Sequence, residues 1–129
     1  MDKKNPWVCI IEDDVFINRA YALKFAHEDI SIKIAEDGEQ GMRLLKSDDT
    51  PFLILLDLML PKKNGFEVLE EIKKNPILKK IPVIIMTNLG QEADAKRGFA
   101  LGAKEYLVKA NIKIDELIKK VKGYLPSKK

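Results

Sequence analysis

The sequence alternates between two kinds of segment five times, and this alternation constrains the fold more than any other feature. Segments of one kind are short and rich in apolar residues, as β-strands are, and cover residues 7–11, 31–35, 52–56, 82–86 and 105–108. Segments of the other kind repeat apolar residues every three or four positions, as amphipathic helices do, and cover residues 15–27, 39–46, 66–74, 91–101 and 113–124. Because each crossover must be right-handed and must cover the sheet, this order predicts a parallel sheet with helices on both faces.

We therefore expect an α/β protein with three layers, in which a doubly wound, five-stranded parallel sheet has the flavodoxin-like strand order 2-1-3-4-5. A chain of 129 residues suits one domain, so we expect a single domain over residues 1–129 with a core from about residue 6 to residue 125. In this fold ligands bind at the carboxyl ends of the strands, where the winding reverses between the first and third strands.

Composition argues against several functional classes. The charged residues, 33% of the chain, include nearly as many acids as bases and leave a net charge of only +3, so we predict no contact with nucleic acid. The longest apolar runs, residues 8–11 and 52–56, are too short to cross a bilayer, and residues 1–6 lead into no signal peptide. We expect a cytoplasmic protein without membrane contact. The single cysteine, Cys9, lies in an apolar run and is interpreted as a small buried hydrophobe.

Polar side chains follow four of the predicted strands at their carboxyl ends. Glu12 and Asp13 follow the first strand, Asp57 the third, Thr87 the fourth and Lys109 the fifth. Crowded carboxylates repel one another unless a cation neutralises them, and oxygen ligands favour a hard ion such as Mg²⁺. Lysine and threonine would then hold an anion beside the aspartate. The set predicts phosphoryl transfer to a carboxylate, with Asp57 as the nucleophile.

These residues and their neighbours, at positions 12–13, 57–65, 86–87 and 106–109, resemble the receiver domain of bacterial two-component response regulators. The resemblance covers essentially the whole chain. It implies that Asp57 is phosphorylated by a sensor histidine kinase or a histidine phosphotransfer protein. It also implies that Mg²⁺, or Mn²⁺, is bound by Asp57, by Asp13 directly, by Glu12 through water and by the backbone carbonyl of Met59.

The same resemblance implies a conformational switch. Thr87 and Tyr106 would form the switch pair, and Lys109 would bridge to the phosphoryl group. Phosphorylation would change the surface of the fourth helix, fifth strand and fifth helix, which a downstream protein or a second copy of the chain would then bind. The chain would act as a stand-alone receiver rather than as an enzyme, although it accepts its own phosphoryl group and slowly loses it again.

The sequence departs from the usual receiver pattern in three ways. Ala110 follows Lys109 where the family has a proline with a cis peptide bond, which costs about 3 kcal/mol or more before alanine, so the loop either holds that strain or runs trans. Asn88 replaces a smaller residue and would narrow access to the phosphoryl group. Met59 and Leu89 are apolar at positions that influence hydrolysis, which predicts a long-lived phosphoryl-aspartate.

Three alternatives stand beside this hypothesis. An aspartate-nucleophile phosphatase would need a second acid two residues after the nucleophile, where Met59 stands. A flavodoxin-like flavin carrier would need a phosphate loop after the first strand, where three consecutive acids, residues 12–14, would repel phosphate. A receiver that has lost phosphorylation would act only as a docking module. Of the remaining polar residues, Asp14 is interpreted as a helix cap and His27 as a solvated helix end.

Overall fold

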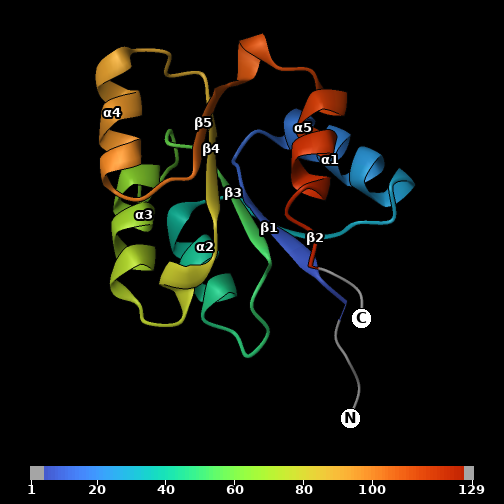
Figure 1. Cartoon of the computed structure of the whole chain (residues 1–129), viewed down its shortest axis with the longest axis horizontal. Coiled ribbons are helices and arrows are strands. Elements are labelled where there is room, and N and C mark those ends of the chain that lie inside the picture. The colour runs from blue at the N-terminus through green and yellow to red at the C-terminus, as the bar shows by residue number, and fades with distance from the viewer. Residues whose placement is uncertain (1–4, 127–129) are drawn as a thin grey trace.

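Five parallel strands form the central sheet of the computed structural model, which describes residues 5–126 (Figure 1). The strands occur in the spatial order β2-β1-β3-β4-β5, so the expected fold class and strand order are confirmed. Their bounds are β1 (Trp7–Ile11), β2 (Ser31–Ala35), β3 (Leu53–Leu56), β4 (Val83–Thr87) and β5 (Glu105–Val108).

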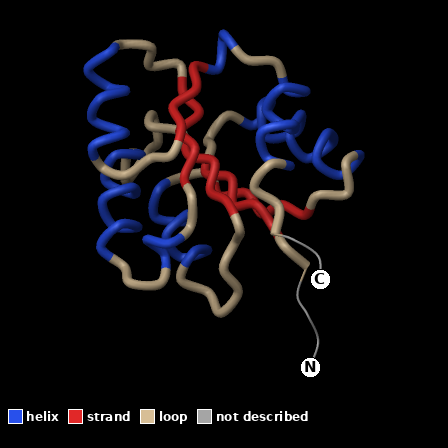
Figure 2. Tube along the Cα trace, viewed as in Figure 1, coloured by secondary structure: helices blue, strands red, loops and turns tan. Residues whose placement is uncertain are grey.

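Five α-helices cover both faces of this sheet. They are α1 (Val15–His27), α2 (Gly38–Leu45), α3 (Gly65–Lys74), α4 (Glu92–Ala100) and α5 (Ile114–Lys122). Helices α1 and α5 lie on one face and α2, α3 and α4 on the other, and Figure 2 shows how regularly helix and strand alternate along the chain. In the described part of the chain no helix is long and apolar enough to cross a membrane.

Two short 3₁₀ turns were not predicted from the sequence. They are η1 (Leu78–Lys80), between α3 and β4, and η2 (Lys109–Asn111), directly after β5. A turn of three residues is too short to show a hydrophobic period, so the pattern that reveals the α-helices gives no signal for these turns.

Each strand contributes alternate side chains to two separate cores. Along β1, Cys9 and Ile11 pack with side chains of α2 and α3, whereas Val8 and Ile10 pack with those of α1 and α5. Both sets are almost completely buried, which explains why the central strands are apolar at every position. The interpretation of Cys9 as a buried hydrophobe is confirmed, and burial raises the pKa of its thiol to about 12.

Local sequence signals fix the ends of the helices. The Asp14 carboxylate accepts hydrogen bonds from the backbone N–H groups of Phe16, at 2.9 Å, and Ile17, at 3.1 Å, which confirms its role as the cap of α1. Helix α3 begins with a capping box between Asn64 and Glu67. After α4, Gly102 adopts a φ of +104°, as expected of a glycine at a helix C-terminus.

Gly65 allows α3 to begin directly against the turn that follows β3. A Cβ atom at this position would lie 2.3 Å from the carbonyl oxygen of Asp57 and 2.5 Å from the Cα of Leu58. Both are backbone atoms, which cannot move aside as a flexible side chain can. We predict that Gly65→Ala lowers the free energy of unfolding by about 1–3 kcal/mol, measured by urea denaturation.

Gly90→Ala is the matched control for this prediction. A Cβ atom at Gly90 would have a side-chain atom of Val108 as its nearest neighbour, at 3.9 Å, which is an ordinary contact distance. This variant should unfold at nearly the same urea concentration as the parent chain. Equal midpoints for the two variants would contradict the steric argument at Gly65.

Candidate functional site

The sheet brings together the polar residues that follow its strands. Glu12 and Asp13 follow β1, Asp57 follows β3, Thr87 ends β4 and Lys109 follows β5. Strand pairing aligns these ends, since Ile11 is opposite Leu56 and Thr87 is opposite Val108. All five predicted residues therefore lie along the carboxyl edge of the sheet, and none lies at the opposite edge.

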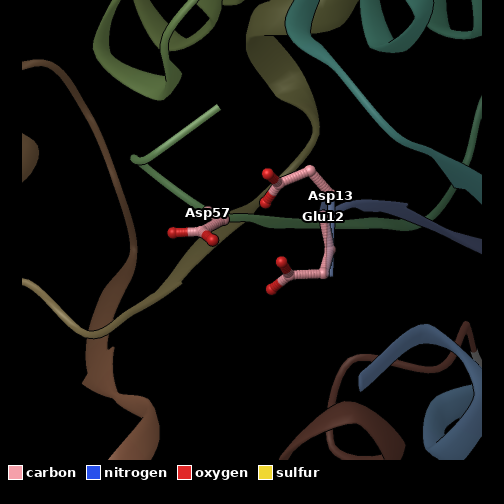
Figure 3. Close-up of side chains that lie close together, drawn as sticks. All are labelled: Glu12, Asp13 and Asp57. Atoms are coloured by element: carbon pink, nitrogen blue, oxygen red, sulfur yellow. The ribbon is translucent and has the colours of Figure 1, made fainter. Parts of the chain in front are cut away.

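Three carboxylates form the centre of this site (Figure 3). One oxygen atom from each of Glu12, Asp13 and Asp57 lies within 4.8 Å of the other two. Glu12 and Asp57 are only 3% and 6% exposed, whereas Asp13 is open to solvent. Like charges this close, two of them largely removed from water, are costly unless a positive charge balances them.

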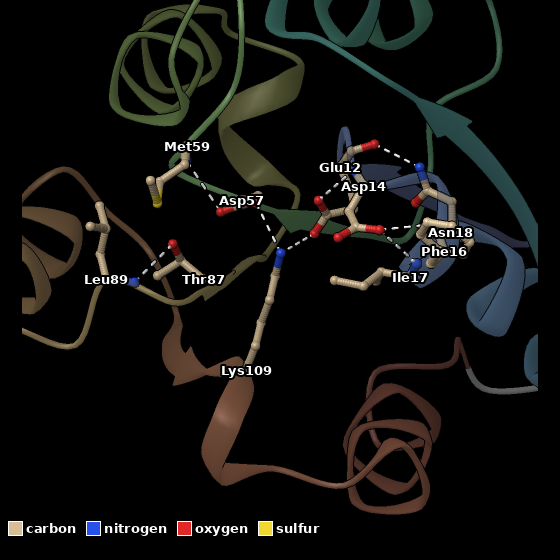
Figure 4. Close-up of polar contacts among 10 residues, drawn as sticks. All are labelled: Glu12, Asp14, Phe16, Ile17, Asn18, Asp57, Met59, Thr87, Leu89 and Lys109. Atoms are coloured by element: carbon tan, nitrogen blue, oxygen red, sulfur yellow. Dashed lines mark hydrogen bonds and ion pairs between the residues drawn. The ribbon is translucent and has the colours of Figure 1, made fainter.

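Lys109 provides part of that balance. Its ammonium group lies 2.9 Å from Oδ2 of Asp57 and also forms an ion pair with Oε1 of Glu12 (Figure 4). Burial raises the pKa of Glu12, and the Lys109 ammonium offsets that effect only in part. Burial would lower the pKa of Lys109, but its two carboxylate partners outweigh burial and raise this pKa, so the lysine remains charged.

Backbone groups hold the buried carboxylates in place. Asp57 is fixed by its own N–H, which donates to the carbonyl of Ile11 at 3.0 Å, and its Oδ1 accepts from the N–H of Met59 at 3.2 Å. Glu12 accepts from the N–H of Asp14 at 3.0 Å through its second oxygen. The carboxylates are thus oriented by the chain itself, as a site for an ion or a reacting group requires.

Thr87 and Tyr106 are linked through one loop residue, Leu89. The Thr87 hydroxyl, fully buried, accepts from the N–H of Leu89 at 3.3 Å. The hydroxyl of Tyr106 donates to the carbonyl of the same residue. The ring of Tyr106 lies beside Gly98, where an added Cβ would approach it to 3.4 Å, so Gly98 makes room for the ring. The loop after β4 therefore connects both residues of the predicted switch pair.

Asn18 supports the site and was missed in the sequence. Its amide nitrogen donates to the carbonyl of Glu12 at 2.7 Å, and the residue is buried. A signal was available, because Asn18 shares the spacing of the buried stripe that continues with Tyr21 and Phe25. A polar residue on the buried face of a helix requires a hydrogen-bond partner, which could have directed attention to it.

The structure also decides the local geometry that the sequence left open after β5. The described residues contain no cis peptide bond, so the chain runs trans from Lys109 to Ala110 and enters η2 directly.

His27 is exposed at the end of α1, as expected. In the loop after β3, Lys62 forms an ion pair with Asp37 and Lys63 forms one with Glu71.

The donor atoms fit a hard divalent cation. All three side chains that converge offer carboxylate oxygens, and the described residues place neither sulfur nor imidazole among them. Three negative charges face one ammonium group, so the site has an excess of negative charge that a divalent ion would neutralise. Glu12, Asp13 and Asp57 are the residues that would hold it.

The doubly wound α/β sheet, with buried carboxylates and a lysine at its carboxyl edge, defines a flavodoxin-like protein with an acidic site. Comparison with known proteins identifies the family. The sequence model of the family described as the response regulator receiver domain matches residues 8–122. The chain belongs to this family of two-component receiver domains.

Individual relatives agree with this assignment. The response regulator Rcp1 of Synechocystis sp. (strain ATCC 27184 / PCC 6803 / Kazusa) is 38% identical over 132 residues, which cover 95% of this chain and 89% of Rcp1. The DNA-binding dual master transcriptional regulator RpaA of the same organism is 35% identical over 93% of this chain, but the match spans only 49% of RpaA. The chain thus has about half the length of some curated relatives and nearly the full length of another.

Two solved structures resemble the chain closely. The phosphorylated cyanobacterial phytochrome response regulator RcpA has a TM-score of 0.80 and 32% identity, with 93% of this chain and 91% of that chain covered. The Mn²⁺-bound form of Rcp1 has a TM-score of 0.75 and 39% identity, with 92% of this chain and 91% of that chain covered.

The crowding of carboxylates leads to a prediction for Asp13→Asn. Removing one of three like charges should raise the free energy of unfolding of the metal-free protein by about 0.5–2 kcal/mol. The same change should weaken Mg²⁺ binding, so Mg²⁺ should raise the melting temperature of the variant less than that of the parent chain. Thermal denaturation at low salt, with EDTA and then with Mg²⁺, measures both effects.

Asp14→Asn is the matched control, because asparagine caps a helix about as well as aspartate and Asp14 is not among the converging carboxylates. This variant should keep the full response to Mg²⁺. If both variants lost the stabilisation by Mg²⁺ equally, the ion would be attracted by the total negative charge of residues 12–14 rather than bound at the site.

Proposed function

We propose that the chain is a phosphoryl-accepting receiver in which the Asp57 carboxylate takes a phosphoryl group from a phosphohistidine of a sensor kinase or phosphotransfer protein. In this step a bond forms between an Asp57 oxygen and phosphorus as the phosphorus–nitrogen bond to the donor histidine breaks. The released imidazole nitrogen takes up a proton from solvent. Residues 1–129 would act as one receiver unit.

One observation carries this proposal: the Lys109 ammonium lies 2.9 Å from a carboxylate oxygen of Asp57, although the two residues are 52 positions apart in sequence. A lysine in this position would move its ammonium group toward the oxygens of an incoming phosphoryl group and neutralise part of their charge. It is already close enough, because it donates a hydrogen bond to the Asp57 carboxylate that would carry the group. Phosphorylated RcpA, at 32% identity, supports the same chemistry in this chain.

The other residues have distinct roles in this proposal. A bound Mg²⁺ or Mn²⁺ would neutralise phosphoryl oxygens during transfer, and the Mn²⁺-bound form of Rcp1 supports such a site. Asp13 and Glu12 would orient the ion, with the carbonyl of Met59 as a further ligand. Thr87 lies at the same edge of the sheet, where its hydroxyl would turn from the Leu89 N–H to donate to the phosphoryl group.

The proposed output follows from the Leu89 connection. If the Thr87 hydroxyl no longer accepts from the N–H of Leu89, the loop loses one of the two hydrogen bonds that Leu89 forms. The other bond, from the Tyr106 hydroxyl to the Leu89 carbonyl, would then change as well, and with it the surface of α4, β5 and α5. A downstream protein or a second copy of the chain would bind that surface. We propose this binding, rather than turnover of a substrate, as the function.

The deciding experiment is incubation with a phosphoramidate, a small phosphodonor, and Mg²⁺, followed by intact mass spectrometry. We predict that the parent chain gains the mass of one phosphoryl group and that Asp57→Asn gains none, because the amide lacks the nucleophilic oxygen. An equal gain in both chains would place the reaction elsewhere. No gain in either chain would favour the alternative of a phosphorylation-inert docking module.

Slow loss of the phosphoryl group is a separate prediction. Met59 is 56% exposed beside Asp57, and Leu89 follows Thr87 by two residues, so neither position offers a polar group that would orient an attacking water. We predict that the phosphorylated parent chain, freed of donor in the presence of Mg²⁺, persists well beyond seconds. Met59→Gln should lose its phosphoryl group faster, and a parent half-life of seconds would refute the prediction.

A further inference from the structure

A groove lined by lysines lies at the amino edge of the sheet, away from the carboxylate site. It has a volume of about 500 Å³ and is lined by four lysines, Lys73, Lys79, Lys80 and Lys104, and by Tyr124. In Figure 1 the turn from α3 through η1 into β4 lies at the end of β4 opposite the loop that leads to α4. Since β4 spans about 16 Å at the usual rise of a strand, a ligand in the groove would not touch Asp57.

The positive charge of this groove is not balanced by nearby acids. Residues 72–91, which include three of the four lining lysines, contain no aspartate or glutamate. Within residues 5–126, none of the four lining lysines forms an ion pair, although eight other lysines do: Lys24, Lys46, Lys62, Lys63, Lys96, Lys109, Lys120 and Lys122. Lys33, Lys74, Lys113 and Lys119 also lack an ion pair within the described residues, so the groove is set apart by having four such lysines around one concavity.

The acid that lies beside the groove is already engaged. Glu105 accepts from the ammonium group of Lys120 at 2.9 Å through one oxygen and from the hydroxyl of Tyr124 at 2.6 Å through the other. Both carboxylate oxygens thus have partners outside the set of four lining lysines. Glu105 offers little compensation to the groove.

Lys73 is held along the groove rather than extended into solvent. Its ammonium group donates to the carbonyl of Lys79 at 3.4 Å, and its Cε would lie 2.8 Å from a Cβ on Gly102, so the absence of a side chain there makes room for the lysine. Burial lowers the pKa of Lys73, and no carboxylate counteracts this effect. A bound anion would supply the missing partner.

Helix ends account for only one of the four charges. Lys73 lies in the last turn of α3, where a cation interacts favourably with the helix dipole. Lys79 and Lys80 belong to η1, which is only three residues long, and Lys104 precedes β5. Three of the four lysines therefore converge without a helix-capping reason.

We propose that this groove binds an anion with several linked phosphate groups, the chemical class that includes inorganic polyphosphate and nucleoside triphosphates. Lysine ammonium groups act as point charges for phosphate, and four of them around one concavity match a chain of phosphates better than a single one. The volume lies in the range typical of small-ligand sites. A flat polyanionic surface would meet such a concavity less well than a compact ligand does.

The test is calorimetric titration of inorganic tripolyphosphate into the full chain without Mg²⁺, so that the carboxylate site cannot take part. We expect binding that weakens with added salt and that falls at least about tenfold in the double variant Lys73→Gln/Lys104→Gln. The double variant Lys33→Gln/Lys96→Gln removes the same charge from β2 and α4 and should bind like the parent chain. Asp57→Asn should also bind normally, which separates this proposal from the function proposed for the carboxylate site.

Further arms decide the class of ligand. A nucleoside triphosphate that binds more tightly than tripolyphosphate would identify the nucleotide as the ligand, and equal binding would identify the phosphate chain alone; both support the proposal. Orthophosphate binding as tightly as tripolyphosphate would overturn it, as would equal losses in the two double variants. Binding of polyglutamate without binding of tripolyphosphate would also overturn it, in favour of a surface for acidic polypeptides.

Discussion

The organising interaction of this structure is the contact of one lysine with two buried carboxylates. Asp57 and Glu12 are almost completely buried at the ends of β3 and β1, where an isolated charge would be strongly disfavoured. Lys109 reaches both from the end of β5, so the site requires the strand order that places these ends together. The compensation is incomplete, because three carboxylates face one ammonium group. That imbalance fits a site for a divalent cation, and it would cost the protein stability when no cation neutralises it.

Much of this arrangement could be predicted from the sequence because it depends on patterns longer than a few residues. The alternation of strand and helix gave the sheet order, and the sheet order placed Glu12, Asp57 and Lys109 together. Hydrogen bonds that depend on the exact path of a loop or the direction of one side chain could not be predicted in this way. The Tyr106 hydroxyl donates to a backbone carbonyl 17 residues away, and no sequence pattern encodes such a bond. Asn18 could be predicted only in part. Its helical spacing indicates a buried position, but the sequence does not indicate that its amide donates to the carbonyl of Glu12.

The loop after β4 has a special position because one of its residues is hydrogen-bonded to both residues of the proposed switch pair. Leu89 is hydrogen-bonded through its N–H to Thr87 and through its carbonyl to Tyr106, one at the end of β4 and the other on β5. A change in either partner therefore alters the same residue. The central strands β1, β3 and β4 beneath it are buried along their whole length, whereas β5, which contains Tyr106, is only half-buried, so a rearrangement of the loop would extend more readily toward β5 than into the centre of the sheet.

The distribution of charge separates the two ends of the sheet, although the net charge of +3 conceals it. Carboxylates gather where β1 and β3 end, and lysines without ion-pair partners in the described chain gather where β4 and β5 begin. Both β4 and β5 run from the lysine groove to the carboxylate site, ending at Thr87 and next to Lys109. A ligand that orders the amino ends of these strands would therefore act on the same two strands that position the threonine and the lysine. Since allosteric coupling is reciprocal, occupation of the carboxylate site would in turn alter the affinity of the groove for that ligand.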